Sequence, residues 1–316
     1  MISTCKCNED SYIDILEQDI ANLDISLLKK LLQDKTTGKN IIWACDEYQK
    51  YGSKYAPGCE ITANLIIGKN TKIIRPRIAK TKSEQINRTR NKAEVFTPAW
   101  LCNEMNNQCD AIWFERDNVF NRPNGHSWTV NNEKIIFDNP KKNWQNYVDL
   151  KCLEITCGEA PYLVSRYDTT TGKYLPVGRR IGVLDRKLRI ISENTDSEED
   201  WWKWVQRAFQ STYGYEYQGD NLLLARENLL WTFQDYYKCK FNKDVPLKYL
   251  KTIVNIIVWN VWQMDGLTDC PPKGVPYTEL YLFEFYQPQD TALPCKIQDW
   301  RCGKPVLFKD LKGAAK

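Results

Sequence analysis

The chain has 316 residues, 42% of them hydrophobic and 12% aromatic, so it is long enough to bury a sizeable core. Its 44 basic and 40 acidic residues leave a formal charge of only +4, so attraction to nucleic acid must come from local clusters of cations. The sequence shows neither a signal peptide nor an apolar run of membrane-spanning length, and we therefore expect a soluble, cytoplasmic protein.

Cysteine and histidine usage excludes several kinds of catalytic site. The twelve cysteines are scattered without a Cys-x-x-Cys pair, and we interpret them as buried free thiols. The alternative, a zinc site, would have to gather distant thiolates such as Cys239, Cys270, Cys295 and Cys302. The single histidine, His126, lies in a predicted loop, which argues against a Ser-His-Asp hydrolase or a Cys-His protease. We expect no metal site.

Residues 1–90 are predicted to form a helical and basic N-terminal region. Apolar residues between Asp10 and Leu32 recur at helical spacing with an interruption near Asp24, which predicts two short helices, the second beginning at Ser26. A polar turn then leads into a predicted strand over 40–44.

The most basic part of the chain is the segment 69–92. Such a run is usually a solvated helix face, but its density also suits a surface that contacts the phosphates of double-stranded DNA. The candidate contact residues are Arg75, Arg77, Lys80, Lys82, Arg88 and Arg90.

The middle of the chain alternates loops and helices. Thr97 is predicted to cap a helix that has Pro98 in its first turn. Residues 118–145 are predicted to be loop with a hairpin of strands 127–130 and 134–137. After a loop over 167–180, the periodicity predicts helices over 181–194 and 198–210.

Three apolar segments each end in an acidic residue. The first reaches Glu154 and continues into a small-residue turn containing Gly158. The second ends at Glu216 and is followed by a predicted helix over 221–237, and the third, over 254–264, is predicted to be a strand ending at Asp265. Three such units predict an α/β fold, a parallel sheet covered by helices, with a ligand crevice at the carboxyl ends of its strands.

Taken in order, four segments resemble the S-adenosylmethionine-dependent adenine methyltransferases of restriction-modification systems, in particular their M subunits. The segments are Phe96-Thr-Pro98, Leu153-Glu-Ile-Thr-Cys-Gly-Glu-Ala-Pro161, Tyr213-Gly-Tyr-Glu216 and Asn260-Val-Trp-Gln-Met-Asp265-Gly-Leu267. The resemblance implies a Rossmann-like methyltransferase domain over 91–316, with an insertion around 169–210. Because the sequence given ends at Lys316, we expect the sheet to lack later strands of the family, together with a target-recognition domain.

The resemblance also implies which residues bind S-adenosylmethionine. These are Phe96, Thr97, Glu154, Gly158, Glu216 and Asp265. In the family, the acid matched by Glu216 holds the ribose hydroxyls and the acid matched by Asp265 faces the adenine ring. Ala160 stands where the family has a second glycine.

The catalytic segment of the family, Asn/Asp-Pro-Pro-Tyr/Phe, is missing. Asp299 and Trp300 lie at a suitable distance after the third segment and are the candidate catalytic pair, an acceptor beside an aromatic ring. The resemblance implies methylation of adenine in DNA, with a restriction endonuclease subunit as a candidate partner. The missing segment motivates the alternative, a non-catalytic DNA-binding or assembly subunit of a restriction-modification or defence complex.

Overall fold

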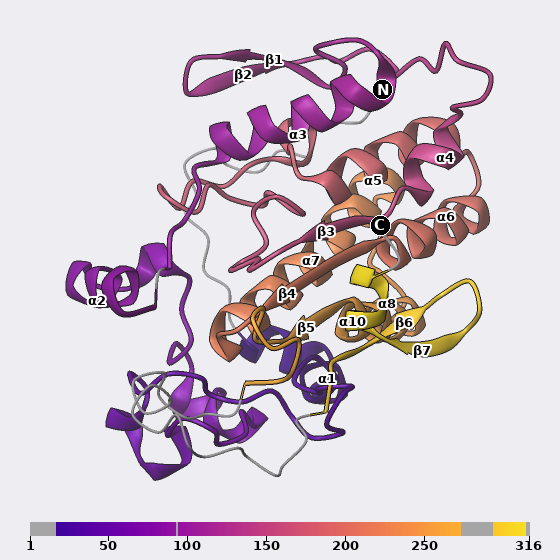
Figure 1. The fold of residues 1–316 in the computed structure, drawn as a ribbon. Helices are drawn as coiled ribbons and strands as arrows, with labels where there is room; N and C mark the ends of the chain where they lie inside the picture. Colours follow the sequence, from indigo (N-terminus) through magenta and orange to yellow (C-terminus); the bar gives the residue numbers. More distant parts are fainter. Residues whose placement is uncertain (1–16, 93, 273–292, 314–316) are drawn as a thin grey trace.

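The computed structural model describes residues 17–92, 94–272 and 293–313 (Figure 1). The α-helices are α1 Glu17–Leu31, α2 Lys82–Lys92, α3 Ala99–Phe114, α4 Trp144–Asp149, α5 Val183–Asn194, α6 Glu198–Gln210, α7 Gly219–Phe241, α8 Leu247–Asn260 and α10 Phe308–Gly313. The strands are β1 Asn121–Asn124, β2 Ser127–Val130, β3 Cys152–Glu154, β4 Thr212–Glu216, β5 Val261–Gln263, β6 Lys296–Asp299 and β7 Lys304–Leu307. Short 3-10 helices lie at η1 Gln49–Tyr51, η2 Ser53–Tyr55, η3 Ala63–Leu65, η4 Gly68–Asn70, η5 Arg77–Ala79 and η6 Val177–Arg179.

A three-stranded parallel sheet lies at the centre, in the order β3-β4-β5. Helices α5 and α6 connect β3 to β4, and α7 and α8 connect β4 to β5. Adjacent parallel strands must be joined by a crossover connection, which here consists of helices. The chain is therefore mixed α/β, as the sequence predicted. The strands Cys152–Glu154 and Thr212–Glu216 run side by side, which brings Glu154 and Glu216 to the same, carboxyl edge of the sheet.

Helices α5 to α8 form a layer behind the strands in Figure 1 and bury most of the large side chains. Trp201 and Phe209 of α6 pack in this core with Phe233 and Tyr237 of α7. Helix α1 contributes Leu28 to the same cluster. Residues on both sides of position 90, the domain boundary expected from the sequence, therefore share one core.

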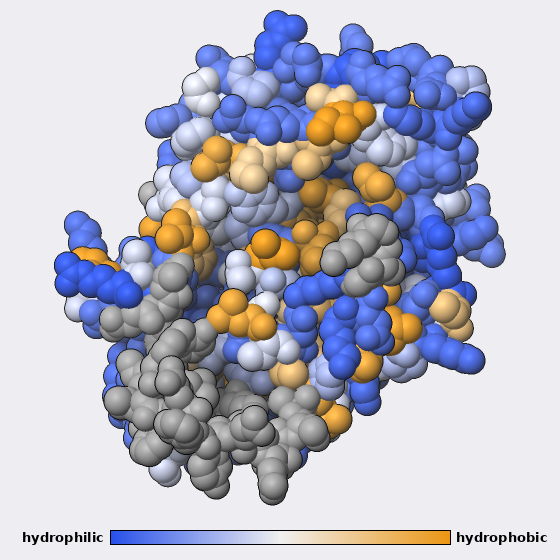
Figure 2. All heavy atoms as spheres, viewed as in Figure 1, coloured by the Kyte–Doolittle hydropathy of each residue, from blue (hydrophilic) through white to orange (hydrophobic). Residues whose placement is uncertain are grey.

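The opposite face of the sheet is covered in part by the antiparallel pair β6-β7 and by α10. Beside them, Leu153 of β3 is 44% exposed and Ile155, which directly follows β3, is 63% exposed. Figure 2 shows hydrophobic side chains gathered in the hollowed middle of this face. The hollow, of about 360 Å³, is the sheet groove, and Tyr213, Tyr215 and Phe308 are among its lining residues.

The N-terminal region docks on the sheet through close backbone contacts. The amide of Gln263 in β5 donates to the carbonyl of Ile42 at 3.0 Å and accepts its N–H at 2.8 Å. A Cβ added to Gly219, the first residue of α7, would lie 2.2 Å from the Ile42 oxygen, so glycine is required there. The predicted break in α1 is confirmed, since Asp24 has φ −169° and its carboxylate accepts the N–H of Ser26. The strand predicted over 40–44 is instead isolated bridges at Asn40 and Ile42.

The prediction for the third strand was wrong over most of its length. Residues 254–260 belong to α8, and the strand that follows is only Val261–Gln263. A continuous apolar run fits a buried helix as well as a buried strand, because neither exposes a polar face that would reveal its period. Ile253, Val254, Ile256, Ile257 and Val258 are all buried.

The predicted hairpin was displaced. Strand β2 is Ser127–Val130 as expected, but its partner is the preceding β1, Asn121–Asn124. Gly125, with φ +55°, provides the left-handed position of the turn between them. The helices predicted over 181–194, 198–210 and 221–237 are confirmed as α5, α6 and the larger part of α7.

No helix in the described ranges is long and apolar enough to cross a membrane. Among the described residues, no group of three or more histidine, cysteine or acidic side chains could hold a metal ion. Cys270 and Cys295 are buried, whereas Cys239 is partly exposed and Cys302 is exposed.

Candidate functional site

The loop after β3 has an unusual backbone. Thr156, Gly158 and Ala160 all have positive φ, at 46°, 54° and 64°. The N–H of Cys157 donates to the carbonyl of Tyr215 at 2.8 Å, which fixes the loop to β4. Ala160 thus holds the left-handed conformation that favours glycine, at a cost of about 1 kcal/mol, and its methyl group is 0% exposed. The loop therefore keeps the backbone conformation of a glycine-containing turn, although residue 160 is an alanine.

Glu154, at the end of β3, holds the far side of this loop. Its carboxylate accepts the N–H groups of Leu163 at 3.1 Å and Tyr162 at 3.4 Å. Burial raises the pKa of Glu154 to about 8, and the charge of Glu216 acts in the same direction. Most of the Glu154 population is therefore protonated at neutral pH.

Glu216, at the end of β4, holds the near side of the loop. One carboxylate oxygen accepts the N–H of Gly158 at 2.8 Å and the other accepts the N–H of Gln218 at 2.9 Å. Burial raises the pKa of Glu216 to about 7, although the two hydrogen bonds act to lower it. The negative charge of Glu94 also raises this pKa. Two carboxyl groups on neighbouring strands thus enclose the Gly158 loop and gain charge readily when a cation approaches.

Phe96 packs beside the loop. A Cβ built on Gly158 would find no neighbour nearer than the tip of the Phe96 ring, at 3.9 Å. The carbonyl of Thr97 accepts the hydroxyl of Thr169 at 3.0 Å. Thr97 does not cap α3, because Pro98 is the capping position and the N–H of Ala99 donates across the chain to a carboxylate. The predicted cap at Thr97 was wrong.

That carboxylate belongs to Asp168, whose second oxygen accepts the N–H groups of Thr170 and Thr171. Asp168 therefore fixes the loop over 168–171 to the start of α3. Sequence reasoning missed this residue, because nothing local links it to a helix that begins 69 residues earlier.

Asp265 lies at the same edge of the sheet. It comes two residues after β5, and the N–H of the intervening Met264 donates to the carbonyl of Glu216 at 3.1 Å. Its carboxylate accepts the N–H of Leu267 at 2.9 Å in a turn that leaves Asp265 partly exposed. Phe96, Gly158, Glu154, Glu216 and Asp265 are thus assembled at or beside one edge.

Asp299 and Trp300 lie at the other end of the sheet. The indole N–H of Trp300 donates at 2.7 Å to Asn260, the residue that immediately precedes β5. Arg301 pairs at 2.5 Å with Asp149, which precedes β3. The carboxylate of Asp299 accepts the N–H of Arg301, and hydrogen bonds from Cys302 and Arg301 lower its pKa to about 2. The structure therefore separates this pair from the Gly158 loop.

Much of the basic segment is neutralised inside the protein. Arg88 is 0% exposed and contacts the carboxylates of Glu47, Glu94 and Asp220. Lys80 meets Asp220 at 3.3 Å. Burial alone would raise the pKa of Asp220, but these two cations hold it well below its usual value.

A fully buried Arg88 does not reach a nucleic acid, which corrects its predicted role. Arg75 is likewise occupied, in an ion pair with Glu84 at 3.1 Å. Lys82 and Arg90 are exposed on α2. Among the residues that the structure describes, three of the six candidates form no ion pair: Arg77, Lys82 and Arg90.

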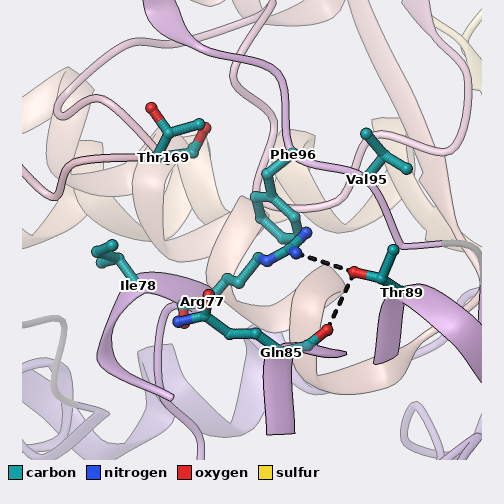
Figure 3. Close-up of a pocket in the computed structure, with 8 residues that line it drawn as sticks. Arg77, Ile78, Gln85, Thr89, Val95, Phe96 and Thr169 are labelled. Carbon is teal, nitrogen blue, oxygen red and sulfur yellow. Dashed lines mark hydrogen bonds between the residues drawn. The ribbon is translucent and has the colours of Figure 1, made fainter. Parts of the chain in front are cut away.

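Arg77 borders a small pocket next to Phe96 (Figure 3). We call it the Arg77 pocket; its volume is about 240 Å³, and its lining includes Arg77, Gln85, Thr89, Phe96, Thr169 and Thr170. The side chains come from η5, from α2, from the segment before α3 and from the loop that Asp168 fixes.

Comparison with known proteins found no matching family model, no matching curated protein and no matching solved structure.

Proposed function

We propose that this chain binds S-adenosylmethionine at the carboxyl edge of β3, β4 and β5, and that it is a methyltransferase-like protein of a restriction-modification system that methylates adenine in DNA. One observation carries the proposal: the carboxyl groups of Glu154 and Glu216 end neighbouring parallel strands and hold the Gly158 loop between them. A crevice at the carboxyl ends of parallel strands is where an open α/β sheet binds its ligands.

The residues at this edge suit the cofactor chemically. S-adenosylmethionine supplies an electrophilic methyl group on a positively charged sulfonium. Glu216 uses one acceptor position on each oxygen for a backbone N–H, which leaves further lone pairs for two hydroxyl donors. The space beside Gly158 lets a ligand approach the backbone closely, and the ring of Phe96 offers an apolar wall. Asp265 would accept from an amino group on the adenine side.

The binding half of the proposal is tested by calorimetric titration with S-adenosylmethionine. We expect saturable binding by the wild type and at least about a tenfold loss in Glu216→Ala, because a charge-assisted contact is removed. Glu104→Ala is the matched control, since Glu104 is exposed on α3, away from the edge. Absence of binding in the wild type, or equal affinity of wild type and Glu216→Ala, contradicts the proposal.

The transfer half is tested by incubating the protein with cofactor labelled in its methyl group and with DNA duplexes that contain or lack adenine. Label in the adenine-containing duplex alone supports adenine methylation. Asp299→Ala is included as a second measurement. Because Asp299 lies at the amino end of the sheet, we expect this variant to retain any transfer that the wild type shows.

A second candidate function is favoured by that same placement. Asp299 and Trp300 were expected to supply a hydrogen-bond acceptor and an aromatic ring for the target adenine. If no other side chains take that role, the chain serves as a non-catalytic DNA-binding or assembly subunit that retains the cofactor edge. This candidate predicts binding of S-adenosylmethionine without labelled DNA under any condition. Label that depends on Glu216 would exclude it.

A further inference from the structure

Arg77 differs from the other buried or half-buried cations of the basic segment. Arg75, Lys80 and Arg88 each meet a carboxylate. The guanidinium of Arg77 meets none within the described residues. It donates instead to the backbone carbonyl of Glu94 and to the hydroxyl of Thr89, both at 2.9 Å. Its charge is therefore held in place without being neutralised.

The position of the Arg77 side chain is fixed from both ends. Its backbone N–H donates to the carboxylate of Glu159 at 2.6 Å, and its carbonyl accepts the amide of Gln85 at 3.1 Å. The guanidinium lies over the ring of Phe96, 4.8 Å from the centroid, as Figure 3 shows. Such an arginine loses little conformational entropy when it binds a ligand, because it is already ordered.

The guanidinium still has donors to offer. It carries five N–H groups in a planar fork, and the two hydrogen bonds above use a part of them. The neighbouring carboxylates have other donors. Asp168 accepts from Ala99 and Thr170, Glu159 accepts from the hydroxyl of Tyr167 as well as from the Arg77 backbone, and the carboxylate of Glu94 accepts from Arg88 and Asn221. The Arg77 pocket therefore combines one uncompensated cation with unused donors.

The size of the pocket limits what it encloses. Its volume of about 240 Å³ is below the roughly 300–1,000 Å³ of pockets that take up a whole small ligand. It suits one group of a larger molecule that extends over the surface. Lys82 and Arg90, exposed on the adjoining α2 and outside any ion pair among the described residues, extend the positive charge beyond it. That distribution suits a ligand with several negative charges more than a single carboxylate.

We propose that the Arg77 pocket binds a phosphate group of a nucleotide, with Arg77 as the ligand of the phosphate oxygens. Arginine matches phosphate geometry through two parallel N–H donors. The choice of a nucleic-acid strand as the source of that phosphate rests on the proposed function; the phosphate chemistry itself does not. Phe96 contacts both Arg77 and the space beside Gly158, so a phosphate held here lies next to the cofactor edge.

The test measures binding of a fluorescently labelled DNA duplex by anisotropy over a range of salt concentrations, in wild type, Arg77→Gln, Arg77→Lys and the control Arg90→Gln. We expect Arg77→Gln to bind about tenfold more weakly and to lower the slope of log affinity against log salt by about one. Arg77→Lys should lose less affinity, because it keeps the charge without the fork. Arg90→Gln should change affinity by less than about threefold, because it removes a solvated charge.

A second arm uses adenosine monophosphate and inorganic phosphate as unlabelled competitors and as direct ligands in calorimetry. Binding of the duplex that depends on Arg77 identifies a strand phosphate. Binding of adenosine monophosphate that depends on Arg77, without duplex binding, identifies a free nucleotide. Equal affinity of wild type and Arg77→Gln for every probe, or equal losses in Arg77→Gln and Arg90→Gln, overturns the assignment.

Calorimetry with S-adenosylmethionine on the same variants separates this inference from the proposed function. Arg77→Gln should bind the cofactor as the wild type does, which also shows that the variant is folded. Cofactor binding that is absent from every variant, beside phosphate binding that depends on Arg77, refutes the proposed function and leaves the phosphate site standing. The reverse pattern refutes the phosphate site alone.

Discussion

On the proposed function, affinity for S-adenosylmethionine is expected to rise with pH, because the carboxyl of Glu216, which would accept two hydroxyl donors as a carboxylate, is protonated below neutrality. Its pKa is raised to about 7. The affinity of a ligand that binds only the ionised carboxylate is lowered by the factor 1 + 10^(pKa − pH), which is about elevenfold at pH 6 and close to one at about pH 8.5. Glu154, with a pKa of about 8, would steepen the rise further if it too must ionise.

The assay is calorimetric titration at several pH values between about 6 and 8.5, in two buffers of different ionisation enthalpy, so that released protons are counted. The wild type should gain at least about tenfold in affinity over this interval and release protons on binding. Glu216→Gln cannot ionise at this position and should bind more weakly with a flatter profile, whereas the control Glu104→Gln should follow the wild type. A wild-type affinity that stays flat, or a slope that Glu216→Gln retains in full, would refute the reasoning.

Three further predictions concern stability. Gly219→Ala should lower the free energy of unfolding by about 3 kcal/mol or more in a denaturant titration, because its Cβ would meet the Ile42 oxygen at 2.2 Å; Gly178→Ala, with nothing within 4 Å, is the neutral control. Arg88→Ala should cost about 3–5 kcal/mol by the same measurement, since it leaves buried carboxylates unpaired; a loss below about 1 kcal/mol would contradict the buried network. Without cofactor, thermal melts should show stability falling as pH rises from about 5 to 7.5, because the folded state retains a proton on Glu216 that the unfolded state, with a pKa of 4.5, releases; this fall should be smaller in Glu216→Gln.

The sheet groove is the other large feature of the surface. Among its exposed members, Leu153 belongs to β3, Ile155 directly follows β3, and Leu311 belongs to α10. Leu311 is on a different element from the candidate cofactor residues, so Leu311→Ser should leave cofactor affinity within about twofold of the wild type. Leu311→Ser is therefore a further control for the titrations above.

Local sequence determined the elements whose pattern is complete within a few residues. Helix α6 was predicted to the residue from the periodicity of its apolar side chains, and the structure adds that Ser197 caps it. The turn at Gly158 and the acids that end β3 and β4 were also predicted, since a strand, its terminal acid and the following turn are contiguous. Their assembly at one edge follows from parallel strands alone.

Tertiary structure decided everything that depends on contacts between distant segments. The basic run gave no sign that Arg88 is buried, because its partner Asp220 lies 132 residues away. Asp299 was chosen by its distance along the chain, which does not determine the end of the sheet at which a later hairpin packs. The apolar run of α8 was predicted to be a strand, and only its packing among neighbouring elements made it a helix. Period and capping are properties of neighbouring residues, whereas charge pairing, burial and strand position are properties of the packed chain, and here they separate Arg77 from the other cations beside it.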